Sequence, residues 1–211
     1  MLGVEQAAAL QLGQARRYMR ALARFWCGGY RGRSKLDPTY VEVTEGRDTK
    51  SQWEDYSSCG DLSQALAYHM GVREAWVNRK AHLGWKAGVN LIRFYDKDGP
   101  AKSPPLGYLP EPGDIGFIWL TGFDAHTFVF GDPLPGGLIE TFNYGAGGMQ
   151  PIHFPGSRMS KSPLRADGGR LYVGAKVLHE VCTVPQLLER VGTLPDISNE
   201  ATAELEARVL E

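Results

Sequence analysis

The chain has 211 residues, of which 43% are hydrophobic and 22% charged, values typical of one globular domain with a real core. Its formal net charge of −1 argues against a broad surface for nucleic acid or anionic membranes. The 26 glycines and 13 prolines favour many turns and short strands over a helical bundle.

Three cysteines, Cys27, Cys59 and Cys182, stand far apart and form no CxxC pair. Such an odd number is not a disulfide framework, and the spacing excludes a zinc ribbon or a thioredoxin motif. We therefore expect a reducing compartment, with no metal and no other cofactor. The first residues lack a basic segment followed by an apolar run, so we expect no signal peptide, a cytoplasmic chain as synthesised, and no membrane partner.

The first predicted element is an amphipathic helix over residues 5–26, ended by Gly28 and Gly29. Its basic side chains form either a solvated face or a face that contacts an anion. They are Arg16, Arg17, Arg20 and Arg24. Residues 30–52 are polar and rich in turn-forming residues, with one short predicted strand at 40–43.

Residues 57–71 are predicted to form a helix with a cysteine in its first turn. Ser58 suits the N-cap, Asp61 stands where a capping-box acid belongs, and Gly71 suits the C′ position. The apolar residues that recur with a helical period are Leu62, Ala65, Leu66 and Met70. A helix N-terminus stabilises a thiolate, which makes Cys59 a candidate nucleophile.

Strands dominate the second half of the chain. After a segment at 72–85, whose Trp76 and Trp85 either line a cleft or pack in the core, we predict strands at 88–95, 113–121, 125–130, 138–144 and 171–177. Residues 145–169 are predicted to be a long loop. A short helix at 184–191 should begin at Thr183, and residues 196–211 should form a polar helix or a tail.

A cysteine nucleophile needs a general base, and His126 is placed to serve because it begins a predicted strand. In a hairpin centred on the following prolines, residue 130 lies opposite 139, 128 opposite 141 and 126 opposite 143. Opposed residues have Cβ atoms about 4.5–5.5 Å apart, so Asn143 is predicted to hold the imidazole. Glu140 points to the other face in this register. It is the second candidate, because a bulge would change the parity.

The order of these motifs resembles that of the NlpC-type and CHAP-type cysteine amidase–peptidases of the papain-like superfamily. The resemblance covers residues 53–180. The matching pieces are Ser58-Cys59-Gly60-Asp61, Pro112-Gly113-Asp114-Ile115-Gly116-Phe117, His126-Thr127-Phe128-Val129-Phe130 and Glu140-Thr141-Phe142-Asn143-Tyr144-Gly145. In the CHAP pattern the glutamate stands two residues before the asparagine, whereas Glu140 stands three before Asn143.

The resemblance implies an α+β papain-like fold, with N-terminal helices packed on an antiparallel sheet of about five strands. We divide the chain into an N-terminal helical extension (1–45), a papain-like hydrolase domain (46–195) and a C-terminal helix or tail (196–211). The implied activity is hydrolysis of peptidoglycan peptide amides by a Cys59–His126–Asn143 or Cys59–His126–Glu140 triad. Candidate substrate-binding residues are Tyr56, Ser58, Asp61, Trp76 and Trp85.

Two alternatives stay open at this point. One is a toxin-like protease or deamidase that acts on a protein substrate. The other is a non-catalytic component of a phage-like particle. Because no export signal is evident, a cell-wall enzyme of this kind needs a phage or secretion partner that delivers it. Cys27 and Cys182 are predicted to be packing residues.

Overall fold

The computed structural model describes residues 4–28, 56–57, 66, 70–71, 102–121, 124–143, 150–151, 158–191 and 194–210. Its main feature is a closed barrel of antiparallel strands in the order β2-β3-β4-β6-β7-β8. Strand β2 pairs with both β3 and β8, which closes the circle. The strand bounds are β2 Ile115–Thr121, β3 Asp124–Leu134, β4 Leu138–Asn143, β6 Arg158–Asp167, β7 Arg170–Val173 and β8 Lys176–Cys182.

The predicted fold class is therefore wrong. We expected an α+β papain-like fold with helices on an open sheet of about five strands, whereas six strands close into a barrel. Closure depends on β6, which occupies part of the predicted loop at 145–169 and pairs with both β4 and β7. The predicted strand at 171–177 is also wrong, because the chain turns at Gly174 (φ 60°) and divides it between β7 and β8.

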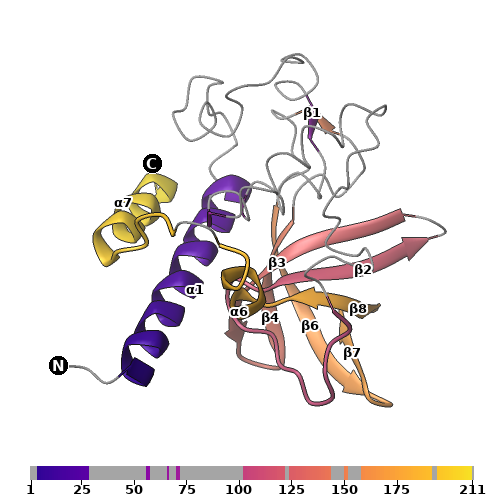
Figure 1. Cartoon of the computed structure of the whole chain (residues 1–211). Coiled ribbons are helices and arrows are strands. Elements are labelled where there is room, and N and C mark those ends of the chain that lie inside the picture. The colour runs from indigo at the N-terminus through magenta and orange to yellow at the C-terminus, as the bar shows by residue number, and fades with distance from the viewer. Residues whose placement is uncertain are drawn as a thin grey trace, which may run out of the picture.

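The three main helices agree better with prediction. Helix α1 spans Val4–Gly28, α6 spans Val184–Leu188 and α7 spans Asn199–Leu210. As predicted, α6 begins after Thr183, whose hydroxyl accepts a hydrogen bond from the backbone N–H of Gln186. Figure 1 shows α1 along one side of the barrel, and α7 packs on the side of α1 that faces away from the barrel. None of the described helices is both long and apolar enough to cross a membrane.

Outside the barrel, β1 (Tyr56–Ser57) and β5 (Gln150–Pro151) form an antiparallel pair. The predicted strands at 40–43 and 88–95 and the segment at 72–85 lie outside the described residues.

Alternation along the strands divides the apolar residues into two clusters. The outer cluster lies between α1 and the barrel wall; it contains Met19 and Leu22 from the helix and Val129 and Phe142 from the strands. The inner cluster gathers residues from strands around the whole barrel and therefore fills its interior. Its members are Ile118, Phe128, Phe130, Ile139, Leu171, Val173 and Leu178.

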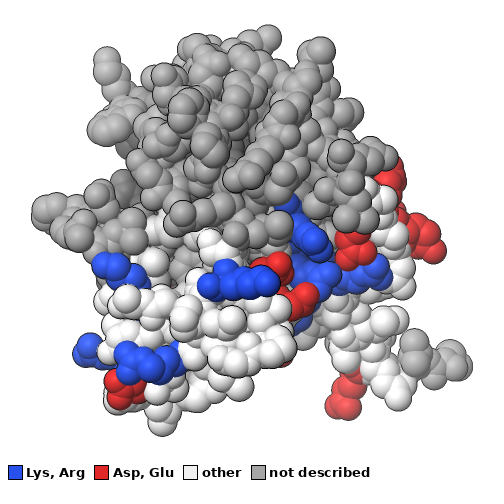
Figure 2. All heavy atoms as spheres, turned by 180° about the vertical axis from the view of Figure 1, so that it is seen from behind, with Lys and Arg blue, Asp and Glu red and all other residues white. Residues whose placement is uncertain are grey.

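The arginines of α1 pair with acidic groups of the same chain. Arg17 contacts Glu206 of α7 at 2.7 Å, and Arg20 contacts Asp132 of β3 at 2.6 Å. Arg16 contacts Asp114 at 2.9 Å. In Figure 2, basic and acidic side chains lie next to one another on the described part of the surface that is shown. Three of the four predicted basic positions therefore contact carboxylates of the same chain and hold elements of the fold together.

Asp114, in the turn that enters β2, is the centre of a buried polar cluster. Its side chain is 1% exposed. Its Oδ1 accepts hydrogen bonds from Arg16 Nη1 (2.9 Å) and Val184 N–H (3.0 Å). Its Oδ2 accepts from Tyr108 Oη–H (2.6 Å) and Glu111 N–H (3.2 Å). This carboxylate thus joins α1, the segment before β2 and α6.

Asp114 and the surrounding burial raise the pKa values of two neighbouring groups, Tyr108 and Cys182. Burial, with Asp114 nearby, raises the pKa of the Tyr108 hydroxyl well above its ordinary value. The same causes raise the pKa of the Cys182 thiol to about 12. Cys182 is 1% exposed and belongs to the outer cluster. The prediction that Cys182 is a packing residue is confirmed, and its thiol is unsuited to nucleophilic attack.

Candidate active site

His126 lies on β3 with its side chain on the face that points into the barrel. The alternation of the strand places His126, Phe128 and Phe130 on this face. The imidazole stacks on the Phe128 ring, with centroids 6.1 Å apart and an interplanar angle of 25°. Only 6% of His126 is exposed. A buried imidazole packed against a phenyl ring has a fixed orientation, which a positioned general base requires.

Asn143 is the last residue of β4, and its Oδ1 lies 2.9 Å from His126 Nε2. The predicted contact between these two side chains is confirmed. The predicted pairing of residues 126 and 143 is wrong, because Asn143 pairs with Phe128 instead. The two chemically relevant residues are therefore diagonal neighbours on one face, a separation that side chains of this length can bridge.

The reason for the displaced register is the hairpin itself. Leu134 pairs with Leu138, so the turn consists of residues 135–137 and is shorter than predicted. The two glycines of this turn, Gly136 and Gly137, have φ angles of 78° and 70°, which favour glycine. A bulge in β3 between Phe130 and Pro133 recovers part of the shift. The net displacement is two residues, so the facing of each side chain is preserved.

Thr141 fixes the side-chain amide of Asn143. The Nδ2 group donates to Thr141 Oγ1 at 3.1 Å and to the Thr141 carbonyl at 3.3 Å. Thr141 is 2% exposed, and its hydroxyl lies 3.4 Å from both the Ser160 carbonyl and Ser162 Oγ on β6. Because Asn143 Nδ2 donates to the two oxygens of Thr141, the amide oxygen is the atom that faces His126.

This arrangement assigns the tautomer of His126. An amide oxygen only accepts hydrogen bonds, so Nε2 of the imidazole must carry a proton and donate it to Asn143 Oδ1. In the neutral ring, Nδ1 is then the nitrogen without a proton. Nδ1 is therefore the atom of this site that can take a proton from a nucleophile.

Glu140, the second candidate for the third member of the triad, lies on the opposite face of β4. It pairs with Lys161 on β6, and its side chain packs over Gly131, where an added Cβ would come within 2.9 Å of Glu140 Cβ. The prediction that Glu140 points away from His126 is confirmed. Asn143, not Glu140, is the polar residue that contacts the imidazole.

Comparisons with protein-family models, with curated proteins and with solved structures give no match for this chain. The assignment of chemistry to this site therefore depends on its own geometry and on the sequence motifs. Among the described residues, no group of three or more histidine, cysteine, aspartate or glutamate side chains is arranged to hold a metal ion.

The predicted nucleophile, Cys59, lies outside the described residues, as do Ser58, Asp61, Trp76 and Trp85. Tyr56 is in β1, where its backbone pairs with Pro151. The end of the predicted cysteine helix is described in part. The Met70 N–H donates to the Leu66 carbonyl at 3.0 Å, and Gly71 has a φ of 93°. These features are those of a helical turn ended by glycine, as predicted.

Leu66 and Met70, from the predicted cysteine helix, show where the end of that helix packs. Both are fully buried in the outer cluster with residues of α1 and the barrel. The apolar face predicted for residues 57–71 is thus buried at these two positions.

Thr141 and Ser162 were missed as site residues by the sequence analysis. Thr141 resembles an ordinary strand residue, and Ser162 falls in the segment predicted as a loop. The parity that placed Asn143 beside His126 also places Thr141 on the same face, and this signal was available in the sequence. No comparable signal was available for Ser162, because its position depends on the pairing of β6 with β4.

Proposed function

We propose that the chain is a cysteine-dependent hydrolase of amide bonds. In this proposal Cys59 is the nucleophile, His126 is the general base and Asn143 orients His126. The observation that supports it most is the 2.9 Å contact between His126 Nε2 and Asn143 Oδ1, with the amide held by Thr141. Cysteine, histidine and asparagine form one of the recurring variants of the nucleophile–base–orienter arrangement.

The tautomer supplies the mechanism. His126 Nδ1 takes the proton of the Cys59 thiol, and the thiolate attacks the carbonyl carbon of the amide. The tetrahedral intermediate collapses as the imidazolium returns the proton to the departing amine, which leaves a thioester. Water then attacks the thioester, His126 again takes the proton, and the acid is released with the thiol restored. The Asn143 oxygen stabilises the imidazolium at both stages.

We propose peptidoglycan peptides as the substrate. The support is the order of the motifs around Cys59, His126 and Asn143, which resembles that of the NlpC-type and CHAP-type amidase–peptidases. The catalytic chemistry alone does not select this substrate, because any amide carbonyl accepts a thiolate. The test of function must therefore separate the activity of the thiol from the identity of the substrate.

The decisive experiment is digestion of purified sacculi with measurement of newly released amine termini. Wild type should release them, while Cys59→Ala and His126→Gln should not. Cys27→Ala, which removes a thiol predicted to pack, is the matched control and should behave as wild type. Release by Cys59→Ala equal to that of wild type would exclude Cys59 as the nucleophile.

Thiol labelling with iodoacetamide across pH separates the two parts of the proposal. An activated Cys59 has a pKa well below the ordinary thiol value of about 8.5, so it should be labelled near neutral pH. Cys182 should be labelled only after unfolding, because burial raises its pKa to about 12. An activated Cys59 without release from sacculi would mean a different substrate. Labelling of Cys59 no faster than Cys27 would contradict the enzymatic proposal as a whole.

A further inference from the structure

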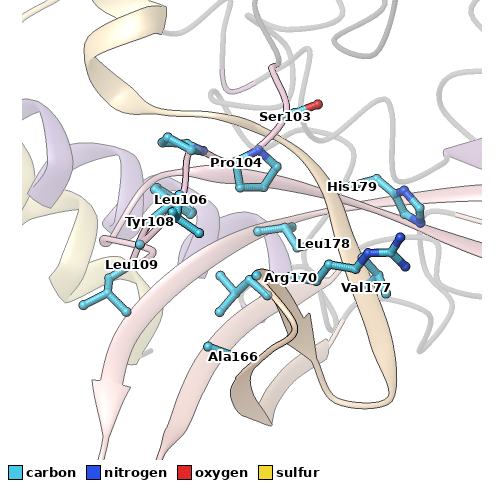
Figure 3. Close-up of a pocket in the computed structure, with 14 residues that line it drawn as sticks. Ser103, Pro104, Leu106, Tyr108, Leu109, Ala166, Arg170, Val177, Leu178 and His179 are labelled. Atoms are coloured by element: carbon cyan, nitrogen blue, oxygen red, sulfur yellow. The ribbon is translucent and has the colours of Figure 1, made fainter.

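A pocket lies between residues 103–109 and the β7–β8 hairpin (Figure 3). Its volume of about 630 Å³ lies within the range of roughly 300–1,000 Å³ typical of small-molecule sites. The wall is largely apolar, and the apolar side chains that line it are Pro104, Pro105, Leu106, Leu109, Ala166, Leu171, Val177 and Leu178.

The pocket is separate from the candidate active site. Leu178, in its wall, pairs with Ile118 on β2, and Ile118 pairs with His126 on β3. Two strand spacings of about 4.8 Å place the Leu178 and His126 backbones roughly 10 Å apart. Ile118, which is 9% exposed and part of the inner cluster, lies between Leu178 and His126 on the intervening strand β2.

The segment that forms one wall is anchored at both ends. Lys102 and Val181 exchange two backbone hydrogen bonds, each 2.8 Å long. At the other end, the Tyr108 hydroxyl donates to the buried carboxylate of Asp114 at 2.6 Å. Consecutive prolines at 104 and 105 further restrict the backbone between these anchors. A wall that is already fixed requires little ordering when a ligand binds.

Two leucines of this wall remain in contact with solvent. Leu106 is 89% exposed and Leu109 is 70% exposed, and these are two of the three most exposed large apolar residues in the described part of the chain. A ligand with an apolar chain would cover them, and the burial of apolar surface on both partners favours binding.

The opposite side of the pocket carries basic groups. These are Arg170 at the start of β7 and His179 on β8. Both residues line the pocket, and in Figure 3 their side chains project on the side away from Leu109. None of the described lining residues is acidic. The wall is thus apolar at one end and basic at the other.

We propose that this pocket binds an unbranched aliphatic carboxylate, with its chain against Leu106 and Leu109 and its carboxylate on the Arg170 guanidinium. The planar guanidinium can donate two parallel hydrogen bonds to a carboxylate, an arrangement that an alcohol of the same chain length cannot match. This site is independent of the hydrolase activity proposed for Cys59 and His126.

Calorimetric titration with octanoate, octanol and octylamine, all below their micellar concentrations, tests the proposal on the full chain. Octanoate should bind wild type at least about tenfold more tightly than octanol, and octylamine should bind no better than octanol. Arg170→Gln should weaken octanoate binding about tenfold and leave octanol unchanged. Arg165→Gln is the matched control, because Arg165 pairs with Asp167 and lies over the Tyr172 ring without lining the pocket.

Ala166→Phe tests the location, since a phenyl ring at this wall position takes up part of the pocket and should weaken octanoate and octanol alike. Unchanged circular dichroism and thermal unfolding of each variant establish that it is folded. The proposal is overturned by absence of saturable octanoate binding to wild type. Equal affinities for octanoate and octanol, or unchanged binding in Ala166→Phe, would also overturn it.

Discussion

Two buried polar groups, Asp114 in the turn before β2 and His126 on β3, differ in the roles that their hydrogen bonds give them. Both carboxylate oxygens of Asp114 accept two hydrogen bonds each from the chain itself. His126 is held at Nε2 by Asn143, and this hold makes Nδ1 the proton-accepting nitrogen of the ring. A polar group saturated by its own fold acts as an anchor. A group fixed at one atom and basic at another is suited to chemistry.

The largest expected effect comes from His126→Gln, which removes the base but keeps a polar side chain. We expect hydrolysis to fall about 10³-fold, within the range for loss of a general base, with a loss of stability below about 1 kcal/mol. Amine release from sacculi and urea unfolding measure the two quantities. A loss of stability as large as that expected for Asp114→Asn would mean that His126 has a structural role like that of Asp114.

Asp114→Asn should do the reverse and reduce stability by about 3 kcal/mol, because Arg16 keeps only the exposed Glu111 as a charged partner and one buried acceptor oxygen becomes a donor. Urea unfolding measures the loss. The matched control is Asp132→Asn, which removes the charge of a partner of Arg20 that is more exposed than Asp114. This change should reduce the free energy of unfolding by less than about 1 kcal/mol. Similar losses in the two variants would show that Asp114 is not the anchor described above.

Thr141→Val removes the hydroxyl that holds the Asn143 amide while keeping the shape of the side chain. We expect the Nε2–H tautomer of His126 to lose its preference and hydrolysis to fall about tenfold, the equivalent of one weak hydrogen bond. Nitrogen-15 NMR of the imidazole reports the tautomer without any substrate. Thr141→Ser keeps the hydroxyl and should restore both properties. An unchanged tautomer in Thr141→Val would remove Thr141 from the site.

The smallest effect concerns the exposed Arg17–Glu206 pair, which is the solvent-facing counterpart of Arg16–Asp114. The hydrogen bond from Arg17 lowers the pKa of Glu206 below its ordinary value. A lowered pKa in the folded state gives stability at pH values above about 4.3, and this stability is lost as pH falls through the folded-state pKa. Glu206→Gln should therefore lower Tm by less than about 2 °C at pH 7 and by less at pH 3 than at pH 7. A larger decrease at pH 3 would contradict this sign.

Features of the site that depend on strand alternation could be predicted from the sequence, whereas features that depend on long-range strand pairing could not. The contact between His126 and Asn143 was predictable because a strand period of two survives a register shift of two. The fold class was not, because closure of the barrel depends on β6. This strand contains Ser160, Ser162 and Pro163 and lacks the β-branched and aromatic residues that indicate strands.

The pairing partners explain why such a polar segment is extended. Strand β6 is paired with β4 on one side and β7 on the other, and its small inward serines leave room for Thr141. Tertiary pairing therefore overrides weak local preference. The hairpin turn at 135–137 shows the same limit. Prolines suggested its centre, whereas the two glycines with positive φ determine it.

Closure of the barrel also restricts how a peptide can be recognised. Each described strand of the ring pairs with two others, so most of the wall is occupied by strand–strand hydrogen bonds. If the proposed hydrolase activity holds, we expect the barrel wall to add little affinity by strand addition, the mode in which main-chain hydrogen bonds bind many sequences alike. Under the same proposal, we expect selectivity to depend on side chains around His126 and Asn143. Changes in those side chains should redirect which peptides are accepted while the barrel itself stays the same.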